Sequence, residues 1–418
     1  MASVNSHIFV VRLFLTVLML YAHIPSPNII VALLLLYIYI TNKNLNVSHI
    51  NNPTVNKIRV FQILIIIVFI VSMIKNMRYL EYVQSNYAQI TGNDIPYLYL
   101  KIFLNGFVLI FIFYTAYNYG LYSFYNRTFR FQVYRYIVFL GTFSALVNII
   151  VWVKETGMVI SRYNFVSPIY NSPSGGIFII MISVFLATEY VSNRYLKTGI
   201  YFVAILNSII IVTKSSQLLF IALFITYMVL KYMNISRSRI NVLITVIFVV
   251  SIGMFLSDNI FNTYSNYYRV LFEDNSYDNM IRTITTNTAL ELFYTNPVLG
   301  IGYGMFGAHN NVVYKGITLG SPHNAFYSIL SEWGVVGLLL MISLLAYILI
   351  MILKILNNKP NNYDIVVSIY LLSTIALFPI GNWALYPPPS ETAYLLYGFV
   401  IWMFIGYASL KATSSKEI

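Results

Sequence analysis

Residues 324–354 read NAFYSILSEWGVVGLLLMISLLAYILIMILK, an apolar run with one carboxylate, Glu332, near its start and a lysine at its end. A helix crosses a bilayer with about 20 apolar residues, and this run is longer than that. Gly334 and Gly337 interrupt it early, and glycines in an apolar helix permit a bend or close packing. The run therefore predicts a membrane-spanning helix that breaks near Gly334.

Similar runs recur along the whole chain. The sequence is 59% hydrophobic and 9% charged, whereas an ordinary globular protein is roughly a quarter charged. This composition excludes a soluble enzyme and a disordered chain, and unbroken apolar runs, instead of alternating ones, exclude a porin-type barrel. We predict an all-α polytopic membrane protein, with residues 1–418 as a single membrane domain. The expected spans, about twelve, are roughly 7–24, 27–41, 58–74, 97–119, 136–153, 175–192, 197–213, 217–233, 240–257, 324–354, 364–380 and 391–410.

Lysine and arginine set the expected orientation. With the N-terminus in the cytoplasm and alternating spans, 16 of the 25 basic residues fall on the inner side and most acids fall on the outer side. Both termini are therefore predicted to be cytoplasmic. The net charge of +12 is explained by this loop bias and by anionic lipid, so a nucleic-acid partner is not expected.

One connection departs from the short-loop pattern. Residues 258–322 form a loop of about 65 residues on the predicted outer face, between the ninth and tenth spans. Loops of this length in compact proteins tend to be functional or disordered. Its aromatic residues and a helix-like stretch at 280–294 favour a folded, working element. No cytoplasmic segment is large enough to bind a nucleotide, which argues against an ATP-driven pump and a nucleotide-sugar-dependent synthase.

Cations on the outer face are the candidates for binding. Arginine is well suited to phosphate, and a ring of cations around one outer cavity would fit a membrane-borne anion. The candidate set is Arg162, Lys214, Arg269, Arg282 and His323. The chain has no cysteine, and no paired carboxylate cluster stands out, so neither a Cys-ligated metal nor another metal site is expected.

His323 is the first candidate for a general base. It lies between Pro322 and Asn324 at the start of the tenth span, where it is placed to accept a proton from a hydroxyl. His309, in the same loop, is the rival base, and Glu332 is a possible orienting partner of His323. Gly300, Gly302 and Gly304 lack the strand, helix and acidic partner of a dinucleotide loop, so a turn with close backbone approach is expected instead.

These motifs resemble a known family. Residues 296–306 (NPVLGIGYGMF) and 321–340 (SPHNAFYSILSEWGVVGLLL) are similar to the signature of the bacterial O-antigen polymerase and ligase superfamily. In that superfamily an outer-face Arg begins a helix that ends in a Pro-x-x-Gly-x-Gly turn, and a His-Asn pair then opens a span. Matching positions are Arg282, Pro297, Gly300, Gly302, His323, Asn324, Gly334 and Gly337. Residues 161–176 resemble the family's Arg-containing stretch before the sixth span, whereas Lys214 stands where the family commonly has Arg.

The resemblance implies a membrane glycosyltransferase of the bacterial inner membrane, with its active site facing the periplasm. Its donor would be an undecaprenyl-diphosphate-linked oligosaccharide, and no cofactor is implied. The implied catalytic residues are His323 and Arg282, and those implied to bind diphosphate or glycan are Arg162, Lys214, Arg269, Asn324 and Tyr303. A polysaccharide polymerase, of O-antigen, capsule or exopolysaccharide, is the first interpretation. The alternatives are an O-antigen ligase and, from another class, a lipid-linked oligosaccharide flippase. A chain-length regulator and a flippase are possible membrane partners.

Overall fold

The computed structural model describes most of the helical part of the chain. The described residues are 2–19, 50–91, 95–156, 184–210, 275–306, 324–358, 360–378 and 393–414, with the short pieces 30–31, 33–34, 37–38, 223–227, 229–230, 313–314, 317–318 and 322.

Helices make up nearly all of the described chain, which confirms the predicted helical class. They are α1 (Ala2–Met19), α3 (Pro53–Thr91), α4 (Ile95–Tyr125), α5 (Arg127–Thr156), α7 (Arg194–Ile210), α11 (Asn275–Thr295), α13 (Ala325–Asn357), α14 (Asn362–Leu377) and α15 (Ala393–Ser414). One small departure lies inside the predicted outer loop. There, β1 (Val313–Tyr314) and β2 (Ile317–Thr318) form an antiparallel pair in which Val313 faces Thr318.

Five described helices are long and apolar enough to cross a membrane. They contain the segments Pro53–Lys75, Gly106–Tyr125, Arg127–Lys154, Ala325–Asn357 and Leu395–Ser414, and two shorter apolar helices cover Ser6–Leu18 and Asn362–Ala376. The spans predicted at 27–41, 175–192, 217–233 and 240–257 lie wholly or partly outside the described residues. A multi-pass helical membrane protein is therefore supported, while the number of twelve spans stays a prediction.

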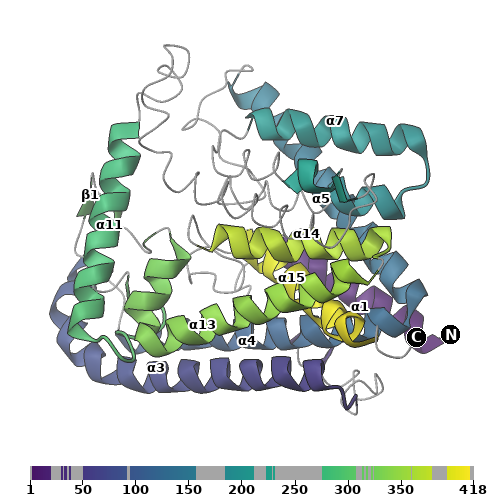
Figure 1. The fold of residues 1–418 in the computed structure, drawn as a ribbon. Coiled ribbons are helices and arrows are strands. Elements are labelled where there is room, and N and C mark those ends of the chain that lie inside the picture. Colours follow the sequence, from purple (N-terminus) through teal and green to yellow (C-terminus); the bar gives the residue numbers. More distant parts are fainter. Residues whose placement is uncertain are drawn as a thin grey trace.

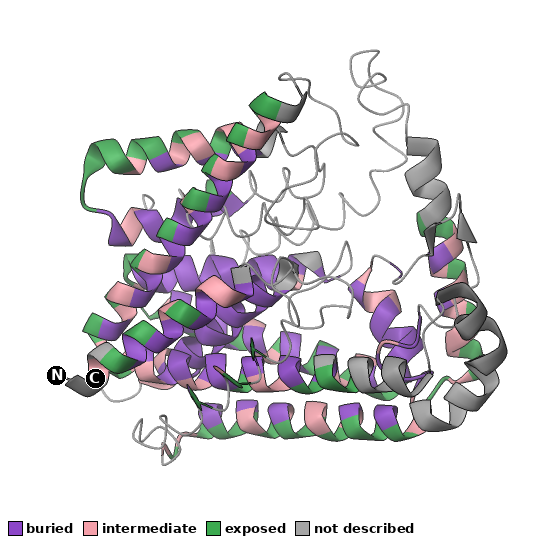
Figure 2. Cartoon of the chain, turned by 180° about the vertical axis from the view of Figure 1, so that it is seen from behind, coloured by how far each residue is buried: buried purple, intermediate pink, exposed green. Residues whose placement is uncertain are grey.

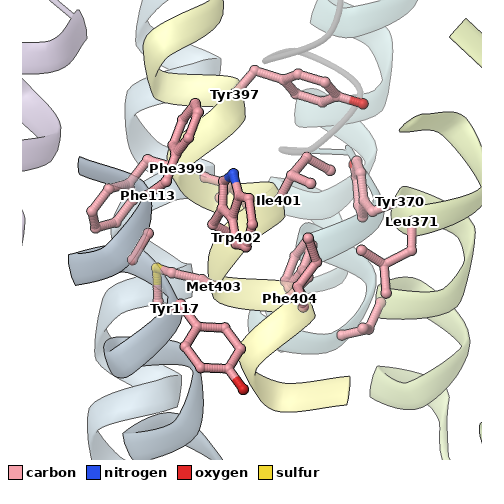
Figure 3. Close-up of a cluster of buried hydrophobic side chains, with 14 of the residues drawn as sticks. Phe113, Tyr117, Tyr370, Leu371, Tyr397, Phe399, Ile401, Trp402, Met403 and Phe404 are labelled. Carbon is pink, nitrogen blue, oxygen red and sulfur yellow. The ribbon is translucent and has the colours of Figure 1, made fainter. Parts of the chain in front are cut away.

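Helix α15 forms the centre of the bundle. It is apolar on all sides, and a helix of that kind is stable only when other helices surround it. Trp402 of α15 stacks on Phe113 of α4 at 5.6 Å between ring centroids, and Phe404 packs on Tyr370 of α14 at 5.2 Å (Figure 3). Helix α3, by contrast, buries one stripe and leaves the residues along its outer side exposed (Figure 2). Exposed residues of this helix include the apolar Ile63, Ile67 and Ile74, as on a lipid-facing helix.

The two ends of the bundle bring together different segments. At one end, Lys411 of α15 pairs with Asp364 of α14 at 3.2 Å, and Asn52, just before α3, donates to Thr413. At the other end lie α11 and the start of α13, which contact each other. Figure 1 shows α11 across this end, opposite the start of α1 and the end of α15. The charge pattern assigns the start of α1, the residues before α3 and α14, and the end of α15 to the cytoplasmic face, and these segments lie at one end of the bundle. Which end faces the cytoplasm stays a prediction.

Candidate functional site

The predicted break in the tenth span is confirmed at Gly334. This residue has φ 64° and ψ −163°, so α13 is interrupted in its third turn. In a continuous helix Val335 N–H would donate to the carbonyl of Ser331, and Val336 N–H to that of Glu332. The break separates these groups, which leaves two donors and two acceptors inside the protein without helical partners.

The segment after α11 supplies all four missing partners. Ile301 N donates to Ser331 O and Gly302 N donates to Glu332 O, both at 2.8 Å. In return, Val335 N donates to Pro297 O at 2.9 Å and Val336 N donates to Val298 O at 3.2 Å. The Pro297–Gly302 turn is therefore joined to the broken helix by backbone hydrogen bonds in both directions, and we call this arrangement the splice.

Two glycines make the splice sterically possible. Gly300 has φ 65°, and a Cβ on it would lie 2.3 Å from the carbonyl carbon of Glu332. A Cβ on Gly334 would lie 2.5 Å from the carbonyl carbon and oxygen of Val298. Both obstacles are backbone atoms, which cannot rotate away as a side chain can. The expected turn with close backbone approach is confirmed, and its physical role is to seat the turn in the break.

Helix α3 holds the same turn from the other side. Ser72 Oγ accepts a hydrogen bond from Tyr303 N at 2.6 Å, and Lys75 Nζ donates to Gly300 O at 2.7 Å. The buried Tyr303 ring lies edge-on to Phe69, with centroids 5.6 Å apart. Sequence reasoning missed Ser72 and Lys75, because a lysine that ends an apolar run is ordinarily an interfacial anchor. Binding of substrate by Tyr303 stays a prediction, and the structure places its ring inside the bundle.

The Glu332 carboxylate also binds the residues that follow this turn. Its side chain is buried, with 4% of its surface exposed, and Oε1 accepts a hydrogen bond from Phe306 N at 3.1 Å. Glu332 thus connects α13 to the end of the glycine string. Its expected partner, His323, lies outside the described residues, so that pairing stays a prediction.

The position of Arg282 requires a correction. The sequence suggested that Arg282 opens a helix at 280–294, but α11 begins at Asn275, so Arg282 lies about two turns inside it, with an exposed side chain. The following turn of α11 approaches the segment that precedes His323. Thr285 is fully buried, and its Oγ1 lies 3.5 Å from the carbonyl oxygen of Pro322. The structure therefore brings the helix of Arg282 to the residue before the candidate base.

Asn324 has an identifiable structural role. It is the N-cap of α13, and its Oδ1 accepts hydrogen bonds from Phe326 N at 2.9 Å and Tyr327 N at 3.4 Å. An N-cap side chain satisfies backbone donors that the first helical turn leaves unpaired. This capping role explains why an asparagine follows His323 directly. The contact of Asn324 with substrate stays a prediction.

The other candidate residues lie outside the described part of the chain. They are Arg162, Lys214, Arg269, His309 and His323. Their convergence on one cavity stays a prediction. Within the described residues, no group of three or more His, Asp or Glu side chains is placed to hold a metal ion.

Comparison with known families bears on the segment that contains the splice. Residues 200–342 match the family model described as O-antigen ligase. The match confirms the resemblance to the O-antigen polymerase and ligase superfamily. It covers about a third of the chain, from α7 through the broken start of α13, and includes Arg282, the glycine turn and His323. No curated protein matches the chain.

Proposed function

We propose that this protein is a surface-polysaccharide polymerase at the periplasmic face of the bacterial inner membrane. It would transfer a growing glycan from undecaprenyl diphosphate to the hydroxyl at the non-reducing end of a new lipid-linked repeat unit. The observation that carries the proposal is the family match over 200–342, because it contains Arg282, the spliced turn and the segment that opens α13. The apolar spans and the scarcity of charge support a lipid-borne substrate.

The proposed chemistry is a single displacement of a diphosphate. His323 takes the proton of the acceptor hydroxyl, whose oxygen forms the new bond to the anomeric carbon of the donor. The bond from that carbon to the phosphate oxygen breaks, and the leaving diphosphate carries its negative charge to the cations of the outer face. Arg282 is assigned to that charge, with Arg162, Lys214 and Arg269 as further phosphate ligands, and Asn324 and Tyr303 on the glycan side.

An O-antigen ligase is the second candidate, because ligase is the description of the matching family. A ligase would pass the same lipid-linked glycan to lipid A core. The chain's wealth of tyrosine, asparagine and isoleucine is typical of divergent polymerases and favours the polymerase. Both enzymes need the same leaving-group stabilisation, so the acceptor alone separates them.

The glycan of a deletion strain tests the proposal. A polymerase predicts lipid A core that carries one repeat unit, whereas a ligase predicts bare core with undiminished lipid-linked polymer. Repeats trapped on the cytoplasmic side would indicate a flippase and contradict both enzyme proposals. The same strain, complemented with plasmid-borne variants, tests the residues.

We expect His323→Ala and Arg282→Ala to remain in the membrane at wild-type level and to lose long-chain glycan on a polysaccharide gel. Removal of a general base commonly lowers a rate by roughly 10²–10⁴. Arg127→Ala is the matched control, because Arg127 is an exposed arginine at the start of α5, remote in the sequence from the proposed site. Normal chain ladders from both site variants would overturn the residue assignment.

A further inference from the structure

Lys75 is a cation that the polymerase proposal does not use. It ends the membrane-crossing segment Pro53–Lys75 of α3 and is partly buried. Its Nζ donates to the carbonyl of Gly300 at 2.7 Å, across 225 positions of the sequence. Gly300 is also the residue whose backbone touches Glu332 at the break in α13. Lys75 therefore lies against the Pro297–Gly302 turn, which carries the Pro-x-x-Gly-x-Gly motif.

The hydrogen bond to Gly300 does not by itself explain a lysine at this position. A neutral donor would satisfy a carbonyl oxygen. Ser72, one turn earlier on α3, binds the same turn without any charge, because its Oγ accepts a hydrogen bond from Tyr303 N. A partly buried ammonium group loses hydration, which is costly unless an opposite charge compensates. Among the residues whose side chains the structure describes, no carboxylate lies within ion-pairing distance of Lys75.

The ammonium group also keeps donors for a ligand. Lysine carries three N–H groups, and Gly300 O takes one of them among the described contacts. An ammonium held at a fixed place by one hydrogen bond is preorganised as a point charge for phosphate. The splice fixes that place, because Val298 before Gly300 and Ile301 after it are both hydrogen-bonded to the broken helix.

We propose that Lys75, which α3 places beside the Pro297–Gly302 turn, is a phosphate-binding residue of the site. The ligand class is a lipid-borne phosphate. If the proposed function holds, on which this assignment rests, the phosphate is the diphosphate of the glycan donor; a phospholipid headgroup of the outer leaflet carries the same chemistry. Lys75 then adds a cation from the N-terminal half of the chain, outside the family-matched segment, to the cations of the outer loop.

Three variants separate the role of the Lys75 charge from the structural role of its contact with the turn. Lys75→Gln removes the cation and keeps a donor, Lys75→Arg keeps the cation, and Ser72→Ala removes the neighbouring hydrogen bond without a change of charge. The full-length protein, reconstituted in nanodiscs of phosphatidylcholine, is titrated separately with undecaprenyl diphosphate and with phosphatidylglycerol. Binding and thermal unfolding are both measured at low and at physiological salt.

We expect Lys75→Gln to bind undecaprenyl diphosphate about tenfold or more weakly, the scale of one charge-assisted hydrogen bond, with a reduced salt dependence. Lys75→Arg should bind within about threefold of wild type, since the charge is retained. Ser72→Ala should unfold at a lower temperature while its affinity changes less than that of Lys75→Gln.

The titrations distinguish failure of the Lys75 proposal from failure of the proposed function. If the wild type binds undecaprenyl diphosphate and Lys75→Gln binds it equally well, the Lys75 proposal is overturned and the proposed function stands. If the wild type binds only phosphatidylglycerol, and Lys75→Gln loses that binding, the proposed function fails while Lys75 remains a phosphate-binding residue. If the wild type binds neither lipid, both proposals are overturned.

Discussion

Substitution of Gly334 by alanine tests the splice directly. Gly334 has φ 64° and ψ −163°, a region of backbone conformation that residues other than glycine adopt at a cost of about 1–3 kcal/mol. An alanine Cβ would also lie 2.5 Å from the backbone of Val298. Gly334→Ala must therefore either keep the break under strain or close it.

Closing the break has a cost that follows from the hydrogen bonds. A continuous α13 would regain the two helical bonds of Val335 and Val336, and it would lose the four bonds of the splice. The net loss is two hydrogen bonds, roughly 2 kcal/mol at about 1 kcal/mol each. Either route thus disfavours the docked turn by about 2 kcal/mol, which shifts the equilibrium towards the undocked turn roughly thirtyfold.

The absence of cysteine from the sequence provides a clean assay. Ile301 is fully buried in the turn, so a single Ile301→Cys substitution reports on docking through its reaction with maleimide in the detergent-purified protein. We expect slow labelling with Gly334 and labelling at least about tenfold faster with Gly334→Ala, because the undocked turn is accessible.

Gly199→Ala is the matched control. Gly199 lies on an exposed part of α7, and a Cβ built on it meets nothing within 4 Å. We expect this variant to label at the parental rate, and a helical alanine in place of glycine should raise stability slightly. Equal labelling rates in the Gly334→Ala and Gly199→Ala proteins would refute the conclusion that glycine at the break is needed for docking.

Two further predictions concern the packing of the bundle. Gly406→Val should lower the unfolding temperature and broaden the size-exclusion peak, because its Cβ would lie 2.3 Å from the carbonyl oxygen of Tyr117 on α4; an unchanged unfolding temperature would contradict this close crossing. Lys411→Ala should lower the free energy of unfolding by up to about 3–5 kcal/mol, the scale for loss of one partner of a buried pair, because it leaves the fully buried Asp364 carboxylate without its counter-charge. Lys411→Arg keeps that charge and should cost less, so equal losses of Lys411→Ala and Lys411→Arg in thermal unfolding would argue against the role of this ion pair.

Much of the framework follows from local sequence. Apolar runs at 58–74 and 324–354 predict α3 and α13, because a hydrophobic helix is read from consecutive residues. The break at Gly334 is also predictable, since glycine is the residue that tolerates its dihedral angles. The prediction for Arg282 was less accurate: polar residues at 275–279 hid the true start of α11, whose sequence has no marked apolar periodicity there.

The sequence by itself determined a helical membrane protein, a large loop before the tenth apolar run and the glycines of its turn. Only the tertiary structure decided what those glycines do. Two sets of contacts show this: the backbone hydrogen bonds between 297–302 and 331–336, and the hydrogen bond from Lys75 to Gly300. They join residues that are distant in the sequence, and no local pattern marks them as partners. Backbone N–H and C=O groups are the same in every residue except proline, so no side-chain pattern identifies which ones will pair. Their pairing depends on where the packing of α3, α11 and α13 places them.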